Sequence, residues 1–161
     1  MPELAPAPAL RDGGPVEGRH SFLIHRINAH LNRLCNPMFR RWRVDIDLAR
    51  MLAVLDEHGA LAAGEIVRVM ALPQSTISHQ LKRLEALGYV RRAPDARDSR
   101  VIIVTLTGEG EAVARESNAL SRQVGGVLEA ALGDLDRPAF AMALTRIDAR
   151  LTDLQTIGGA P

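Results

Sequence analysis

Short polar and basic side chains gather in one run of the sequence, between residues 74 and 83: Gln74, Ser75, Thr76, Ser78, His79, Lys82 and Arg83. Amide, hydroxyl and imidazole groups form hydrogen bonds with base edges, and lysine and arginine also contact phosphates. Apolar residues recur at helical spacing on the opposite side of the same run: Ile77, Leu81, Leu84 and Leu87. The run therefore predicts either the recognition helix of a DNA-binding protein or an amphipathic helix with a solvated polar face.

A second charged segment follows at residues 94–100, between two stretches rich in β-branched residues, 89–92 and 101–106. This arrangement predicts a β-hairpin with a polar tip. An arginine at such a tip, here Arg97, can enter a narrow minor groove, where the negative potential is enhanced. Asp95 and Asp98 can fix the loop by capping its turn and by pairing with neighbouring arginines. A charged tip can also serve solubility, but its place directly after the polar helix favours a DNA-contacting wing.

The remaining periodicity predicts the elements that position these groups. We expect a first helix from residue 21, with a kink or an end at Pro37, and a second helix that is capped by Asp45 or Asp47 and ends at Gly59. A short third helix is expected around 66–70, and a fourth at 73–87, ending at Gly88. A fifth helix is expected at 108–132. A last helix starts at Asp136 and Pro138 and carries an apolar seam: Phe140, Leu144, Ile147, Leu151 and Leu154. The predicted fold is mainly α with a small β-hairpin, a winged helix-turn-helix flanked by helices at both ends.

Three motifs of the chain resemble those of the MarR family of winged helix-turn-helix transcription regulators. They are LKRLEALGYVRR at 81–92, the wing pattern D-x-R-D-x-R at 95–100, and L-T-x-x-G at 106–110. The resemblance covers roughly residues 21–154. It implies that Arg97 enters the minor groove and that Asp95 and Arg100 brace the wing. The chain departs from the family pattern at 61–64, where a Ser or Thr helix cap is frequent, and at His79, where arginine is frequent.

The same resemblance implies an organisation and a function. Residues 45–107 are the expected DNA-binding domain, and residues 19–44 and 108–157 are the expected dimerisation helices. Residues 1–18, rich in proline and glycine, are the expected mobile arm. The protein is then a regulator, most often a repressor, that binds a pseudo-palindromic operator as a homodimer and responds to a ligand or to stress. The alternative is a winged-helix module that binds protein, which is disfavoured because polar and cationic groups cluster on the two elements that DNA needs.

Four residues of the first helix region are candidates for an effector site: Cys35, Met38, Phe39 and Trp42. Arg33, Asn36 and Arg40 lie near Cys35 in the sequence and could favour a reactive thiolate, although a lone helical cysteine also serves as a small buried hydrophobe. Two interpretations are open for Met38, Phe39 and Trp42. They could line a pocket for a small organic ligand, or they could pack in the core or in an interface.

Composition narrows the remaining classes. The net charge of +1 gives no indication of nucleic-acid binding, but residues 71–100 hold six Lys/Arg against three acids. The single cysteine excludes an internal disulfide and favours a reducing compartment. The sequence has no long apolar run and no nucleophile motif, and His20, His25 and His30 do not share a helix face. We expect no signal peptide, because a charged start followed by an apolar run is lacking. We therefore expect a cytoplasmic protein that is not an enzyme, with no membrane partner, metal or cofactor.

Overall fold

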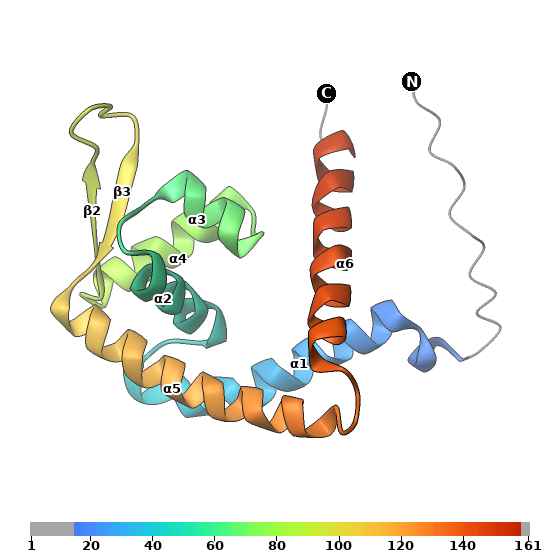
Figure 1. Ribbon diagram of the computed structural model, residues 1–161. Helices are drawn as coiled ribbons and strands as arrows, with labels where there is room; N and C mark the ends of the chain where they lie inside the picture. The colour runs from blue at the N-terminus through green and yellow to red at the C-terminus, as the bar shows by residue number, and fades with distance from the viewer. Residues whose placement is uncertain (1–14, 159–161) are drawn as a thin grey trace. The chain divides into compact units, whose positions relative to one another are not determined.

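The computed structural model describes residues 15–158 (Figure 1). Fourteen of the eighteen residues of the expected mobile arm lie outside the described residues, and Val16–Gly18 form a short 3-10 helix, η1. The chain divides into two compact units, Met1–Asn118 and Ala119–Pro161. The further elements are α1 (His20–Phe39), η2 (Arg40–Trp42), α2 (Ile46–His58), β1 (Leu61–Ala62), α3 (Ala63–Met70), α4 (Gln74–Ala86), β2 (Val90–Pro94), β3 (Ile102–Leu106), α5 (Gly108–Ala131) and α6 (Arg137–Gly158).

The first unit contains an antiparallel sheet in the order β1-β3-β2. The predicted hairpin is confirmed: β2 pairs with β3, with Val90 opposite Leu106 and Pro94 opposite Ile102. The sequence pattern does not predict β1, which has only two residues and pairs with β3 through Leu61 opposite Val104. Figure 1 shows β2 and β3 extending away from the helices as a long wing beside α3 and α4.

The core of this unit lies among α2, α3, α4, β3 and the start of α5. Its buried side chains include apolar positions expected from helical spacing, Leu48, Met51, Leu52, Leu55, Ile66, Ile77, Leu81, Leu84 and Val113, together with Val104 of β3. Each such side chain removed from water contributes roughly 1.5–3 kcal/mol to the free energy of folding. This shared core fixes the helix-turn-helix, α3 and α4, against the sheet that carries the wing.

The helix α1 is longer than the sequence predicts. Pro37 is expected from the sequence to kink or end this helix; it lies inside the last turn, and the helix ends at Phe39 and passes into η2. A proline inside a helix removes one backbone donor and crowds the carbonyl four residues earlier, and α1 ends only two residues after Pro37. Towards the C-terminal end of α1, Cys35 and Phe39 are buried, whereas Leu23, Ile24 and other apolar side chains of the helix are exposed in the single chain.

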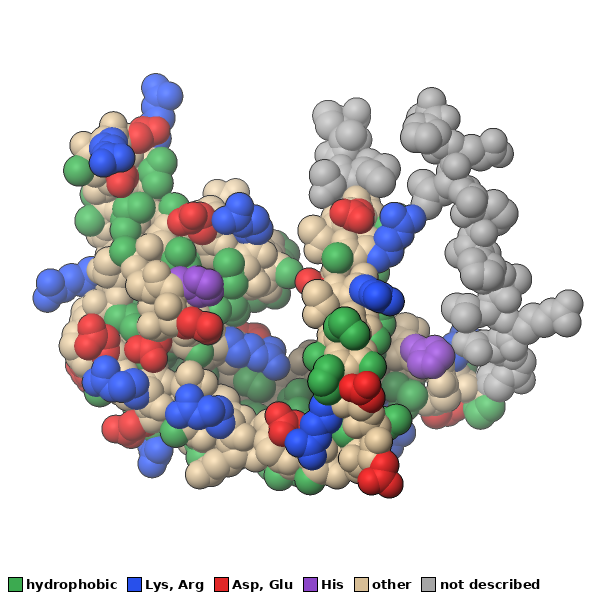
Figure 2. Space-filling view, in the orientation of Figure 1, with side chains coloured by type: hydrophobic (Ala, Val, Ile, Leu, Met, Phe, Trp, Pro, Cys, Tyr) green, Lys and Arg blue, Asp and Glu red, His purple; other side chains and the backbone are tan. Residues whose placement is uncertain are grey.

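The second unit holds the end of α5 and the whole of α6. Asp136 starts the last helix as expected: its Oδ1 accepts a hydrogen bond from the amide of Ala139 at 3.1 Å. The predicted seam of α6 is exposed in the single chain: Phe140, Leu144, Ile147, Leu151 and Leu154. Figure 2 shows apolar side chains interspersed along α6. In the described part of the chain, no helix is both long enough and apolar enough to span a bilayer.

Candidate nucleic-acid interface

The helix α4 is delimited by local sequence signals. It starts after Pro73 and ends in a Schellman motif, in which the amide of Gly88 donates to Glu85 O and the amide of Tyr89 to Leu84 O. Gly88 has φ +78°, a left-handed conformation that glycine adopts without steric cost. The end predicted at Gly88 is therefore confirmed. The preceding helix α3 lacks a Ser or Thr cap, as expected, and Glu65 Oε2 instead accepts a hydrogen bond from the amide of Ala62.

Most of the predicted polar residues of α4 lie on its accessible side. Ser75, His79 and Lys82 are exposed and follow one line along the helix, because they are spaced by four and three residues. Gln74 and Ser78 are also exposed, on the side towards the wing, and Thr76 is half-buried. Within the described residues, the ammonium group of Lys82 has no ion-pair partner. This line of donors and acceptors is free to meet a ligand.

Arg83 differs from the other members of the predicted set. Its guanidinium Nη1 lies 2.9 Å from Oδ2 of Asp45, the N-cap residue of α2. The structure thus brings Arg83 together with a residue 38 positions earlier in the chain.

Gln80 is a buried polar residue of α4 that sequence reasoning missed. Only 8% of its surface is exposed, and its side-chain oxygen has no hydrogen-bond partner among the described residues. It lies on the packing face, three residues after Ile77 and four before Leu84. That spacing is the signal that could have indicated its burial. The fourth predicted packing residue, Leu87, is only half-buried.

The tip of the wing is held by aspartate side chains and backbone amides. Asp95 Oδ1 accepts hydrogen bonds from the amides of Arg97 at 2.7 Å and Asp98 at 3.1 Å. Asp98 Oδ1 accepts one from the amide of Arg100 at 3.0 Å. Capping by the aspartates is thus as expected, but the expected pairing with arginine side chains does not occur. A short carboxylate reaches amides two or three residues ahead, whereas a guanidinium would have to fold back over the turn.

The arginines of the tip are therefore available. Within the part of the chain that the structure describes, neither Arg97 nor Arg100 forms an ion pair, and both side chains are exposed. Arg100 takes part in bracing the wing through its backbone amide and not through its guanidinium. Figure 2 shows basic side chains standing out at the end of the wing.

The base of the wing is bonded to α4 by an ion pair that the sequence pattern did not reveal. Arg92 Nε on β2 donates to Glu85 Oε2 at 2.9 Å, and a second guanidinium nitrogen contacts the same oxygen. The hydrogen bond lowers the pKa of Glu85 and raises the pKa of Arg92. The pair joins the last turn of α4 to β2.

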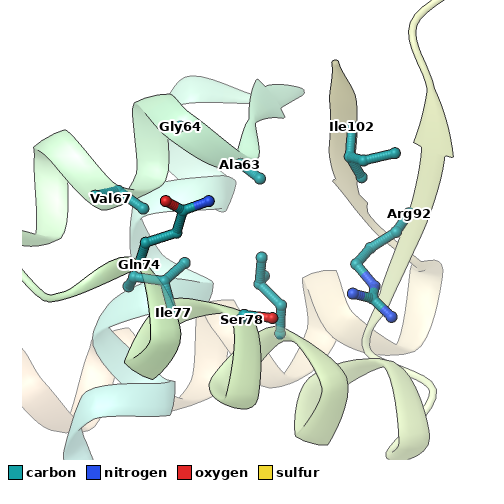
Figure 3. A pocket seen from close by; sticks show the side chains of 9 residues that line it. Ala63, Gly64, Val67, Gln74, Ile77, Ser78, Arg92 and Ile102 are labelled. Carbon is teal, nitrogen blue, oxygen red and sulfur yellow. The ribbon is translucent and has the colours of Figure 1, made fainter. Parts of the chain in front are cut away.

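A cavity of about 180 Å³ lies between α3, α4 and the wing (Figure 3). Its lining combines small and apolar residues with three polar side chains: Gln74 and Ser78 from α4, and Arg92 from β2. In Figure 3, Gln74 and Ser78 lie on one side of this space, and Arg92 lies on the other. The space between the helix and the wing is thus polar on both sides.

The four candidate effector residues lie where α1 meets α2. Phe39 and Trp42 are buried with their ring centroids 6.1 Å apart, and Met38 is half-buried. The Arg41 guanidinium lies 3.9 Å from the centroid of the Trp42 ring, a cation–π contact. The Trp42 carbonyl accepts a buried hydrogen bond from the Tyr89 hydroxyl at 3.0 Å. Phe39 and Trp42 therefore form part of the packing of the single chain.

Cys35 is 3% exposed, and burial raises the pKa of its thiol, with Arg50 acting in the opposite direction. The arginines close to Cys35 in the sequence thus do not produce a low-pKa thiol. No group of three or more His, Cys, Asp or Glu side chains that could hold a metal ion occurs among the described residues.

Comparison with known proteins agrees with this geometry. Residues 49–101, which include α3, α4 and β2, match the model of the MarR family. Over this segment the chain is similar to regulators of the MarR family. The HTH-type transcriptional regulator TtmR of Methylorubrum extorquens strain PA1 is 39% identical over 77 residues, which are 48% of this chain and 40% of TtmR. The chain spans about half the length of the curated relatives it matches.

Two solved structures share the fold of this chain at low sequence identity. A cysteine-to-serine mutant of MarR from E. coli, complexed with operator DNA, is 24% identical with a TM-score of 0.65, over 81% of this chain and 92% of that one. BpsR of Bordetella bronchiseptica, whose DNA binding is regulated by 6-hydroxynicotinic acid, is 22% identical with a TM-score of 0.68, over 87% and 99% of the two chains. The mainly helical fold with a small antiparallel sheet, predicted from the sequence, is thus confirmed.

Proposed function

We propose that this protein is a sequence-specific DNA-binding transcription regulator that binds a pseudo-palindromic operator as a homodimer. The observation that carries the proposal is the pairing of two unoccupied surfaces: the line Ser75, His79 and Lys82 on α4, and Arg97 at the tip of the wing. The ion pair between Glu85 and Arg92 joins α4 to the base of the wing, and the shared core holds both elements in place. The name of TtmR and the operator complex of MarR support the same function.

Each element has a groove that it fits. The α4 helix has the dimensions of a rod that enters the major groove, which is about 12 Å wide and presents a distinct pattern for each base pair. Gln74, Ser75, Ser78 and His79 lie in its first two turns, where a recognition helix reads base edges, and Lys82 lies further on, within reach of the phosphates. Arg97 is the residue that would enter the adjacent minor groove.

Dimerisation is supported by the apolar surface outside the DNA-binding domain. Exposed large apolar side chains recur along both helices expected to dimerise, at Leu23, Ile24, Ile27 and Leu34 of α1 and at Phe140, Leu144, Ile147 and Leu151 of α6. Surfaces of this kind mark interfaces, because a stable monomer rarely leaves them in water. A two-fold dimer places its recognition helices about 34 Å apart, one helical turn of DNA, which is why we expect a pseudo-palindromic operator.

The proposal includes a response of the regulator to a small-molecule signal. The DNA binding of BpsR is regulated by 6-hydroxynicotinic acid, which supports a small organic effector for this chain as well. The region of Met38, Phe39 and Trp42 is the candidate site. We infer that the protein is not an enzyme and that it acts in the cytoplasm, as expected of a protein whose partner is double-stranded DNA.

The test is a fluorescence-anisotropy titration of the purified protein against its own upstream intergenic DNA and a scrambled duplex, at two salt concentrations. We expect nanomolar affinity for the upstream DNA, one dimer per site, and at least about a thousandfold preference over the scrambled duplex. Arg97→Ala weakens operator binding by about tenfold or more. Lys82→Ala weakens binding to both duplexes and lowers the salt slope by about one. Arg115→Ala is the control, because Arg115 lies on α5 and pairs with Glu111.

Equal affinity for the upstream and scrambled DNA would call for selection of binding sites from the whole genome. If that selection also returned no preferred sequence, the proposal would be wrong and the alternative, a winged-helix module that binds protein, would take its place. Unchanged binding of Arg97→Ala to a confirmed operator would remove only the role of the wing.

A further inference from the structure

Arg83 lies on the flank of α4, in a different direction from its neighbour Lys82. Consecutive residues of an α-helix diverge by about 100°, so these two cations do not share a face. Lys82 is exposed and has no ion-pair partner in the described residues, whereas Arg83 Nη1 lies 2.9 Å from Asp45 Oδ2. A guanidinium bonded to a carboxylate has most of its charge compensated and would have to leave that partner to contact a phosphate.

The carboxylate that holds Arg83 is itself fixed in place. Asp45 caps α2: its Oδ1 accepts a hydrogen bond from the amide of Leu48 at 3.0 Å, while Oδ2 contacts Arg83. The next amide, that of Ile46, donates to Oδ1 of Asn36 on α1 at 2.9 Å. The N-terminus of α2 is therefore bonded to α1 on one side and to α4 on the other.

A second hydrogen bond joins the same region to the base of the wing. The Tyr89 hydroxyl, just before β2, donates to the carbonyl of Trp42 at 3.0 Å in a buried position. The segment 42–46 thus contacts both elements of the candidate interface, α4 through Asp45 and the wing through Trp42. The bond between Arg83 and Asp45 joins the flank of α4 to the N-terminus of α2, so it opposes rotation of α4 about its own axis.

We propose that Arg83 is a positioning residue, which sets the orientation of the recognition helix through Asp45 and does not contact the DNA phosphates. This inference rests on the proposed function. It replaces the expectation from the sequence that Arg83 lies beside Lys82 on the DNA backbone. Both side chains of the pair are partly exposed, 43% and 36%, so the pair adds little to global stability, and its effect falls on the orientation of α4.

Three variants test the proposal: Arg83→Ala, Asp45→Asn and the double substitution. Asparagine retains the helix cap but removes the charge that holds Arg83. We expect each single variant to lower operator affinity by about threefold to tenfold, with no change in salt slope. The double variant should be no weaker than the single ones, because both remove the same contact. Arg83→Lys should recover part of the affinity, since it can still pair with Asp45.

If Arg83 contacted a DNA phosphate, the variants would give different results, and these would overturn the proposal. Arg83→Ala would then lower the salt slope by about one and weaken binding to scrambled DNA as well, as expected for Lys82→Ala, which serves as the reference. Asp45→Asn would leave affinity unchanged or raise it, because it frees Arg83 and removes a negative charge.

Amide hydrogen exchange of the free protein gives a readout that does not depend on DNA. Faster exchange in the second half of α4 is expected in both single variants, and unchanged exchange in both would contradict the positioning role of Arg83. The wild-type titration separates the two proposals: absence of a preferred operator refutes the proposed function, whereas normal operator binding by both variants refutes only the role of Arg83.

Discussion

Gly110 lies so close to Tyr89 that a Cβ atom added to the glycine would overlap the Tyr89 carbonyl oxygen and stand 2.8 Å from the carbonyl carbon. The same oxygen accepts a hydrogen bond from the amide of Thr107 at 3.0 Å. The Thr107 hydroxyl donates to the carbonyl of Gly88 at 2.6 Å and caps α5 by accepting from the amide of Gly110 at 3.0 Å. The L-T-x-x-G motif thus has a physical reason: it packs the first turn of α5 against the residue that begins the wing.

Replacing Gly110 by alanine should destabilise the protein strongly. The obstructing atom belongs to the backbone and cannot rotate away, so α5 or the start of β2 must shift. We expect a loss of about 3 kcal/mol in the free energy of unfolding, measured by urea denaturation. Gly108→Ala is the control, because Gly108 is in the same turn and has nothing within 4 Å of the added atom. A Gly110→Ala protein as stable as Gly108→Ala would contradict this account of the motif.

The wing should lose function when its cap is removed, even though Arg97 remains. Asp95→Ala removes the acceptor of the amides of Arg97 and Asp98, so the tip is no longer held in one shape. A hydrogen bond contributes about 1 kcal/mol, and we expect operator affinity to fall by about fivefold in anisotropy titrations. Asp95→Asn keeps an acceptor oxygen at the same position and should bind close to wild type. If Asp95→Ala binds as tightly as Asp95→Asn, the cap does not matter for binding.

The parts of this fold that the sequence predicts are those governed by local rules. The change from helical to β periodicity after Gly88 locates the wing, and a left-handed glycine ends α4 as expected. The exposed line Ser75, His79 and Lys82 follows from helical spacing alone. These features need no knowledge of what packs against them.

The contacts that fix these elements to one another could not be predicted. The partners of Arg83 and of Tyr89 lie 38 and 47 residues earlier in the chain, and no periodic pattern relates them. The strand β1 has only two residues, which is too short to give a pattern. At the wing, the composition correctly indicates capping but does not show that the aspartates bond to amides in place of arginine side chains.

The ion pair at the base of the wing should make stability depend on pH in the acid range. The hydrogen bond from Arg92 lowers the pKa of Glu85, so the pair stabilises the fold above the ordinary carboxyl pKa. That contribution is lost as the pH falls below about 4 and through the lowered pKa, because Glu85 is then protonated. We therefore expect Glu85→Gln to have a lower Tm than wild type at pH 7, and the difference to shrink by pH 3.

The matched control for this prediction is Glu57→Gln, an exposed position of α2 without an ion-pair partner in the described residues. Its Tm should follow that of wild type across the pH range. A difference between Glu85→Gln and wild type that stays constant down to pH 3 would mean that the carboxylate charge is not what stabilises the pair.

Cys35 should behave as a core residue and not as a sensor. Burial raises the pKa of its thiol, so the reactive thiolate is scarcer at neutral pH than in an ordinary cysteine. We expect iodoacetamide at pH 7.5 to alkylate Cys35 much more slowly in the native protein than in the protein unfolded in urea, with both rates followed by mass spectrometry. Hydrogen peroxide at low concentration should leave operator binding unchanged, and Cys35→Ala should bind as wild type does. Rapid formation of a sulfenic acid at Cys35, with release of DNA that Cys35→Ala does not show, would restore the oxidant-sensing interpretation.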